Sequence, residues 1–175
     1  MTDSVVVVAA HPDDEAIGCG GSIVKHVWRG DTVHVIFMSS GVGSRAASSD
    51  AERQLRMQSA KRAAEILGVT STHCLDLPDN RMDELPLLEV VQSLEKILFT
   101  LGPEVIYTHH AGDLNVDHRI THESVVTACR PQPQVTVREI LAFEVVSSTE
   151  WRTPGIQPFL PNLFIDISDS LGKKI

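Results

Sequence analysis

The chain alternates short apolar runs with longer stretches in which apolar residues recur every three or four positions. The first run, Ser4–Ala10, is almost entirely valine and alanine, which is typical of a strand buried on both faces of a parallel sheet. The stretch from Asp14 to Arg29 has acids in its first turn, an inward stripe that begins at Ile17, and a glycine after its end, which predicts a helix. Further strands are predicted at 32–38, 72–77, 105–108, 140–146 and 163–167, and further helices at 50–67, 85–101 and 117–129.

This alternation predicts the fold class α/β, as a three-layer Rossmann-like domain with a mostly parallel sheet. Parallel strands that alternate with helices are joined by right-handed crossovers, which cover both faces of the sheet. The length suits a single domain over residues 1–175. Ser168–Leu171 resembles the start of a helix that stops at Ile175, so the domain could lack a C-terminal helix. A Gly- and Ser-rich loop at 39–49 is long enough to cover a substrate.

Composition narrows the classes of function. The chain carries a net charge of −8 and contains no run of Lys or Arg, which argues against a nucleic-acid partner held through phosphate contacts. No apolar stretch approaches the roughly 20 residues needed to span a membrane, and a basic signal segment is absent from the N-terminus. The three cysteines are far apart in the sequence and indicate buried thiols of a cytoplasmic protein.

The polar residues after the first strand carry the candidate chemistry. His11-Pro12-Asp13-Asp14-Glu15 places one imidazole and three carboxylates where a strand ends and a helix begins. In open α/β sheets, ligands bind at this edge. Clustered carboxylates repel one another unless a cation or a shared proton offsets the repulsion. The segment therefore predicts a metal site to which His11 and Asp14 contribute ligands.

A second polar segment follows the predicted strand at 105–108 and lies on the same edge of the sheet. Four histidines and two aspartates fall between His109 and His122. A catalytic zinc site has three protein ligands and one open position, so we expect this segment to supply the third ligand.

Asp13 and Asp14 are adjacent residues at a strand–helix junction, and their side chains are expected to point apart. One carboxylate can then bind the metal while the other acts as a general base. The alternative for Asp13 is a helix N-cap. The alternative for Glu15 is an acid of the first helical turn that is favoured by the helix dipole.

These motifs resemble the LmbE-like or PIG-L family of metal-dependent N-deacetylases, which act on N-acetylglucosaminyl conjugates. The resemblance covers nearly the whole chain. It rests on Ala10–Glu15 and on Asp117-His118-Arg119, with support from Arg56 and from Leu77–Asn80.

The resemblance implies that His11, Asp14 and His118 bind zinc, with iron(II) as the other candidate cofactor. It implies that Asp13 is the general base acting on a metal-activated water, and that Asp117 tunes its neighbouring histidine.

Three residues are candidates for substrate binding. Arg56 matches an arginine that holds the substrate in relatives. Asn80 and His110 each follow a predicted strand and are expected to reach the same edge of the sheet.

One position departs from the family pattern. Many relatives carry a histidine where this chain has Asn115. An asparagine can donate a hydrogen bond to the oxyanion of the transition state, but it cannot deliver a proton. The proton for the leaving amine is therefore expected to come from Asp13, His109 or His110.

We therefore expect a zinc-dependent hydrolase that removes an N-acetyl group from an amino sugar or an N-acetylglucosaminyl conjugate. Its partner would be a small N-acetylated sugar, without nucleic acid or a membrane span, and the resemblance is compatible with a homo-oligomer. Two alternatives remain open. One is a metal-dependent amidohydrolase that acts on a non-sugar amide, and the other is a non-catalytic Rossmann-like binding module.

Overall fold

The computed structural model describes residues 2–43, 49–153 and 157–175. Within these ranges five strands form one sheet in the order β3-β2-β1-β4-β5, and every neighbouring pair is parallel. The predicted parallel sheet is confirmed. The strands are β1 (Ser4–Ala9), β2 (Thr32–Ser39), β3 (Ser71–Leu77), β4 (Val105–His109) and β5 (Glu139–Phe143).

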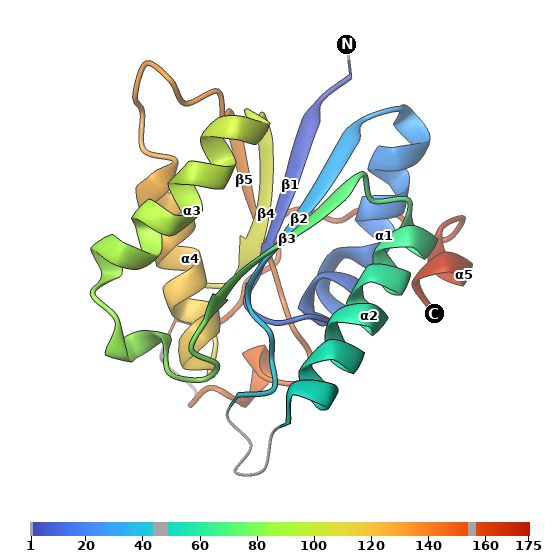
Figure 1. The fold of residues 1–175 in the computed structure, drawn as a ribbon. Helices are drawn as coiled ribbons and strands as arrows, with labels where there is room; N and C mark the ends of the chain where they lie inside the picture. Colours follow the sequence, from blue (N-terminus) through green and yellow to red (C-terminus); the bar gives the residue numbers. More distant parts are fainter. Residues whose placement is uncertain (1, 44–48, 154–156) are drawn as a thin grey trace.

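Helices cover both faces of the sheet, which confirms the three-layer Rossmann-like class (Figure 1). Helices α1 (Asp14–Arg29) and α2 (Asp50–Leu67) lie on one face, and α3 (Leu87–Leu101) and α4 (Val116–Ala128) lie on the other. The short helix α5 (Leu171–Lys174) packs against α1 and α2. Two single 3-10 turns, Met82–Glu84 and Thr149–Trp151, complete the helical elements of the described residues.

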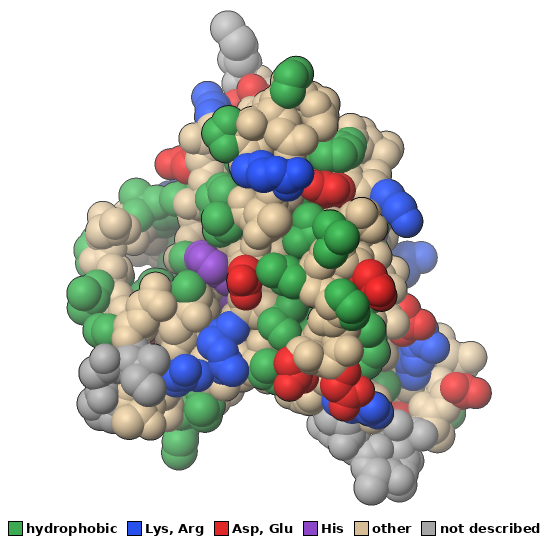
Figure 2. Space-filling view, turned by 90° about the vertical axis from the view of Figure 1, so that its left-hand side faces the viewer, with side chains coloured by type: hydrophobic (Ala, Val, Ile, Leu, Met, Phe, Trp, Pro, Cys, Tyr) green, Lys and Arg blue, Asp and Glu red, His purple; other side chains and the backbone are tan. Residues whose placement is uncertain are grey.

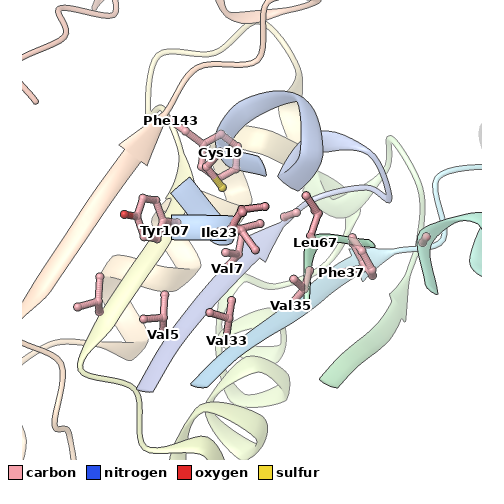
Figure 3. Packing of buried hydrophobic residues seen from close by; sticks show 14 of the residues in the cluster. Val5, Val7, Cys19, Ile23, Val33, Val35, Phe37, Leu67, Tyr107 and Phe143 are labelled. Carbon is pink, nitrogen blue, oxygen red and sulfur yellow. The ribbon is translucent and has the colours of Figure 1, made fainter. Parts of the chain in front are cut away.

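The apolar run of β1 contributes to two hydrophobic cores. Val5 and Val7 point into the core beneath α1 and α2, which Figure 3 shows, whereas Val6 and Val8 point into the core beneath α3 and α4. All four side chains are completely buried. A central parallel strand lacks an exposed face, which explains why its sequence is a continuous apolar run without polar alternation.

Two details of the sequence prediction are wrong. Residues 163–167 do not form a strand, and Leu163 and Phe164 are exposed, because an apolar segment becomes a strand only where a neighbour supplies the hydrogen-bond ladder. Ile17 is also exposed. The backbone of α1 is non-helical at Cys19, so residues before this kink do not continue the inward stripe of Ile23.

The sheet topology brings the two polar segments together. The chain runs outward from β1 through β2 to β3 and then returns to β4, which pairs with the other side of β1. Such a reversal opens a crevice at the carboxyl ends of the two central strands. The segment beginning at His11 and the segment beginning at His109 both start at this crevice.

Other expectations concern the surface. No helix within residues 2–43, 49–153 and 157–175 is long and apolar enough to cross a membrane. Basic and acidic side chains are intermingled on the face that carries α3 and α4 (Figure 2). Residues 44–48 of the predicted substrate loop at 39–49 lie outside the described residues.

Candidate metal centre

The two polar segments meet at the side chains of His11, Asp14 and His118. The Oδ2 atom of Asp14 lies 3.3 Å from Nδ1 of His11 and 3.3 Å from Nε2 of His118. Ligand atoms that sit 2.0–2.1 Å from a tetrahedral zinc ion are roughly 3.3 Å apart. The three side chains are buried, and one donor atom from each lies within 4.8 Å of the others. The spacing therefore fits three ligands of one cation.

Each imidazole contacts a buried carboxylate through the ring nitrogen that faces away from Asp14. The Nε2 atom of His11 lies 3.1 Å from Asp117 Oδ2 and 3.2 Å from Asp79 Oδ1, and the Nδ1 atom of His118 lies 3.3 Å from Asp113 Oδ1. Histidines that bind metal usually donate their other ring N–H to a carboxylate or carbonyl. Each imidazole is thus oriented with its remaining nitrogen towards Asp14.

A second group of donors, His11 with Asp79 and Asp117, also has suitable spacing. The oxygens of Asp117, however, already accept the backbone N–H groups of Asn80 at 2.6 Å and Met82 at 3.1 Å. This carboxylate therefore anchors the turn after β3 and supports His11. All three members of the group His11, Asp14 and His118 line one cavity, whereas Asp117 does not, so this group is the one that is open to a substrate.

The electrostatics of the metal-free site follow from these contacts. Burial disfavours a charged His11, but hydrogen bonds to Asp117, Asp14 and Asp79 outweigh it and raise the pKa of the imidazole to about 11. Burial likewise opposes the charge of Asp14, yet hydrogen bonds to His11 and His118 hold the pKa of this carboxyl far below its usual range. In the metal-free protein, the surrounding carboxylates therefore keep His11 protonated, and this proton takes the place of part of the cation's charge.

Asp13 adopts an unusual backbone conformation at the start of α1. Its φ angle is 119°, and its side chain makes no capping hydrogen bond, so the helix-cap interpretation is not supported. A non-glycine residue in such a region costs about 1–3 kcal/mol and is held by its surroundings. The half-exposed carboxylate accepts a hydrogen bond from Arg56 Nη2 at 2.8 Å. Burial and the charge of Asp14 raise the pKa of Asp13, and Arg56 opposes this rise.

These groups open into a cavity of about 300 Å³. The side chain of Asn115 caps α4 by accepting the N–H of Asp117, and its Nδ2 donates to Asn80 Oδ1 at 3.3 Å. Most of the residues predicted from the sequence thus share one cavity, which is lined by His11, Asp13, Asp14, Gly41, Arg56, Asp79, Asn80, Asn115, His118, Ser147 and Ser148.

Two predicted residues lie elsewhere. Asp117 is buried beneath the cavity, and the histidine that it contacts is His11, not its sequence neighbour His118. His110 lines a separate cavity of about 670 Å³ beside β5, and its Nε2 lies 2.8 Å from the carbonyl oxygen of Gln157. The structure therefore does not bring His110 to the cluster.

His109 is completely buried and stacks on His118 with ring centroids 3.9 Å apart. Its Nε2 accepts the backbone N–H of Ala10 at 2.9 Å, and burial lowers its pKa to about 3. A neutral imidazole with this hydrogen bond is a poor proton donor. Of the three candidates for protonating a leaving amine, Asp13 is the one that lines the cavity.

Asp113 is a functional residue that the sequence analysis missed. It is completely buried and contacts both His118 and the turn at Ser148 and Thr149. An aspartate after a glycine is typical of a turn, so its sequence context alone does not distinguish it from an ordinary loop residue.

Comparisons with known proteins show what this chain is similar to. A family model described as PIG-L: GlcNAc-PI de-N-acetylase matches residues 6–129. An uncharacterized deacetylase of Escherichia coli is 28% identical over 94% of this chain and 82% of its own length. The diacetylchitobiose deacetylase of Thermococcus kodakarensis is 40% identical over 98% of this chain and 66% of its own length. The chain thus spans about two thirds to four fifths of these relatives.

Solved structures show the same fold. The 4-carboxy-2-hydroxymuconate hydratase from Pseudomonas putida superposes with a TM-score of 0.80 at 23% identity, covering 99% of this chain and 76% of its own. A hydratase on this fold shows that the fold alone does not determine the reaction.

Proposed function

This chain belongs to the PIG-L family of GlcNAc-PI de-N-acetylases, and on that premise we propose that it hydrolyses the N-acetyl group of an amino sugar or an N-acetylglucosaminyl conjugate. The observation that carries the proposal is the convergence of His11, Asp14 and His118 on one point of a cavity that Asp13 also lines. The similarity to the diacetylchitobiose deacetylase of Thermococcus kodakarensis supports an amino sugar as the substrate.

In this proposal His11, Asp14 and His118 hold a zinc ion, with iron(II) as the alternative. When bound, such a cation lowers the pKa of a water molecule and polarises a carbonyl group. The carboxylates of Asp117 and Asp113 keep the two imidazoles in the required orientation, because each faces the ring nitrogen that does not bind the cation.

Asp13 acts as the general base. Its carboxylate takes a proton from the attacking water, whose oxygen bonds to the acetyl carbon, and the same carboxyl group returns the proton to the amine nitrogen as the C–N bond breaks. The products are acetate and a free amine. Arg56 holds Asp13 through the hydrogen bond at 2.8 Å, and the raised pKa of Asp13 favours its acceptance of a proton.

Asn115 and Asn80 form the polar wall of the cavity. The Nδ2 group of Asn115 is a neutral donor that suits a developing oxyanion, while Arg56 and Asn80 bind the hydroxyl groups of the sugar. A volume of about 300 Å³ lies at the lower end of the range for ligand pockets. It therefore suits one sugar ring, with the conjugated group outside.

Release of free amine from a panel of substrates tests this proposal. The panel contains N-acetylglucosamine, diacetylchitobiose and a non-sugar acetamide, each assayed with added zinc or iron(II). We expect turnover of the sugars. Turnover of the non-sugar amide alone would favour the amidohydrolase alternative. A protein that holds no metal and turns over none of the panel would be a binding module.

Two variants test the assigned roles. Asp13→Ala should lower kcat about 10²- to 10⁴-fold and retain metal, whereas the exposed Asp169→Asn serves as its control. His118→Ala should lose bound metal, measured by elemental analysis, with His73→Ala on β3 as its control. Full activity of Asp13→Ala, or an unaltered metal content in His118→Ala, contradicts the corresponding role.

A further inference from the structure

Glu15 is a buried carboxylate that the proposed reaction does not use. Its side chain is part of α1, it is only 2% exposed, and it does not line the cavity that contains Asp13 and Asp14. Within the described residues it takes part in no ion pair with Lys, Arg or His. An acid that merely favours the helix dipole can remain in solvent, so the burial of Glu15 calls for another explanation.

The Oε2 atom of Glu15 accepts the backbone N–H of Asp13 at 3.0 Å. Asp13 is the residue whose φ angle of 119° departs most from ordinary backbone in this segment, and its own side chain does not cap the helix. A strained conformation persists only where neighbouring groups hold it. The hydrogen bond that Asp13 donates to Glu15 holds the backbone of Asp13, and the hydrogen bond that Arg56 donates at 2.8 Å holds its carboxylate.

We propose that Glu15 is a positioning residue, whose buried carboxylate keeps Asp13 in its strained conformation and thereby aims the Asp13 carboxylate into the cavity. This inference rests on the proposed function, in which Asp13 is the general base. A displacement of about 1 Å in a reacting group can cost 10²-fold in rate. Glu15 therefore affects the reaction through Asp13 without touching the substrate.

Two variants of Glu15 test whether the reaction requires the hydrogen-bond acceptor at this position. The amide oxygen of glutamine can accept the same N–H, so Glu15→Gln should retain most of the activity. Glu15→Ala removes the acceptor and should lower kcat about 10- to 100-fold, with KM and metal content unchanged. Equal activity of Glu15→Ala and the unaltered chain, per metal-loaded molecule, overturns the proposal. If Glu15→Ala does not fold, Glu15→Asp, whose side chain is one methylene shorter, replaces it.

A double-mutant cycle distinguishes this role from helix capping. If Glu15 acts through Asp13, then adding Glu15→Ala to Asp13→Ala should cause no further loss of the residual kcat. Losses that multiply would show an independent, structural effect. Val24→Ala, which removes buried side-chain volume from the same helix, is the matched control. It should lower the unfolding midpoint but leave the kcat of the folded, metal-loaded protein unchanged.

A crystallographic readout does not depend on activity. In metal-free crystals, Asp13 should leave the positive-φ region in Glu15→Ala and remain near 119° in Glu15→Gln. A φ angle that is unchanged in Glu15→Ala overturns the proposal. The two hypotheses fail separately. Full activity of Asp13→Ala refutes the assignment of the base, whereas an inactive Asp13→Ala beside a fully active Glu15→Ala refutes only the role of Glu15.

Discussion

Replacing Asp113 by asparagine should weaken zinc binding about 10- to 100-fold while the protein remains folded. Asp113 is completely buried. Its Oδ1 lies 3.3 Å from His118 Nδ1 and accepts the backbone N–H of Asn115 at 2.8 Å. Its Oδ2 accepts hydrogen bonds from the hydroxyls of Thr149 at 2.6 Å and Ser148 at 3.1 Å. Asparagine keeps the shape of this side chain but removes the negative charge behind the imidazole.

The magnitudes follow from these four contacts. A 10- to 100-fold loss of affinity corresponds to about 1.4–2.8 kcal/mol. An asparagine can keep its oxygen towards Asn115 and turn its NH₂ group towards the two hydroxyls, which also accept hydrogen bonds. The free energy of unfolding should then fall by only about 1 kcal/mol. Asp113→Ala would instead remove the acceptor from all four contacts, at a cost of at least about 3 kcal/mol.

Zinc affinity is measured by competition with a chromophoric chelator, and stability is measured by denaturant unfolding of the metal-free protein. The exposed Asp169→Asn serves as the control for loss of one negative charge. An Asp113→Asn protein that binds zinc as tightly as the control would refute the argument that this carboxylate supports His118. Weakened binding in the control as well would point to net charge instead of the local contact.

Three further outcomes follow from the structure. Gly41→Ala places a side chain at φ +70°, with its Cβ 3.2 Å from Pro12 Cδ, and should lower the free energy of unfolding by roughly 1–2 kcal/mol. Gly172→Ala is the control, because its added Cβ meets open space, and it should leave the free energy of unfolding unchanged. The pKa of His11 is raised to about 11. The protonated imidazole therefore stabilises the metal-free fold fully below pH 6.5, and this stabilisation is lost as the pH rises through 11. Because His11 is protonated at pH 7, zinc binding at that pH should release protons. Binding enthalpies that are independent of the buffer's protonation enthalpy would contradict this. Leu94→Ala removes a completely buried side chain and should lower the free energy of unfolding, measured in urea, by about 2–5 kcal/mol. A decrease of less than about 1 kcal/mol would contradict this and mean that neighbouring side chains move in to fill the cavity.

The fold was largely predictable from the chain's local patterns. The valines of β1 predict a central parallel strand because such a strand is buried on both faces. The glycines after α1 and α2 mark helix ends because both have positive φ angles. Prediction failed at residues 163–167 because apolar residues do not specify which strand edge, if any, they will pair with.

Local sequence patterns predict which chemical groups this protein offers and that these groups follow β1 and β4, because His11, Asp14 and His118 lie in short motifs beside apolar runs. Other features depend on how distant segments pack: which nitrogen of each imidazole faces Asp14, that Asp117 supports His11, that Asp113 supports His118, and that His110 lies apart. Those contacts join segments up to about a hundred residues apart along the chain. Their distances depend on how the strands are ordered and how the turns are packed, which no local pattern of residues specifies.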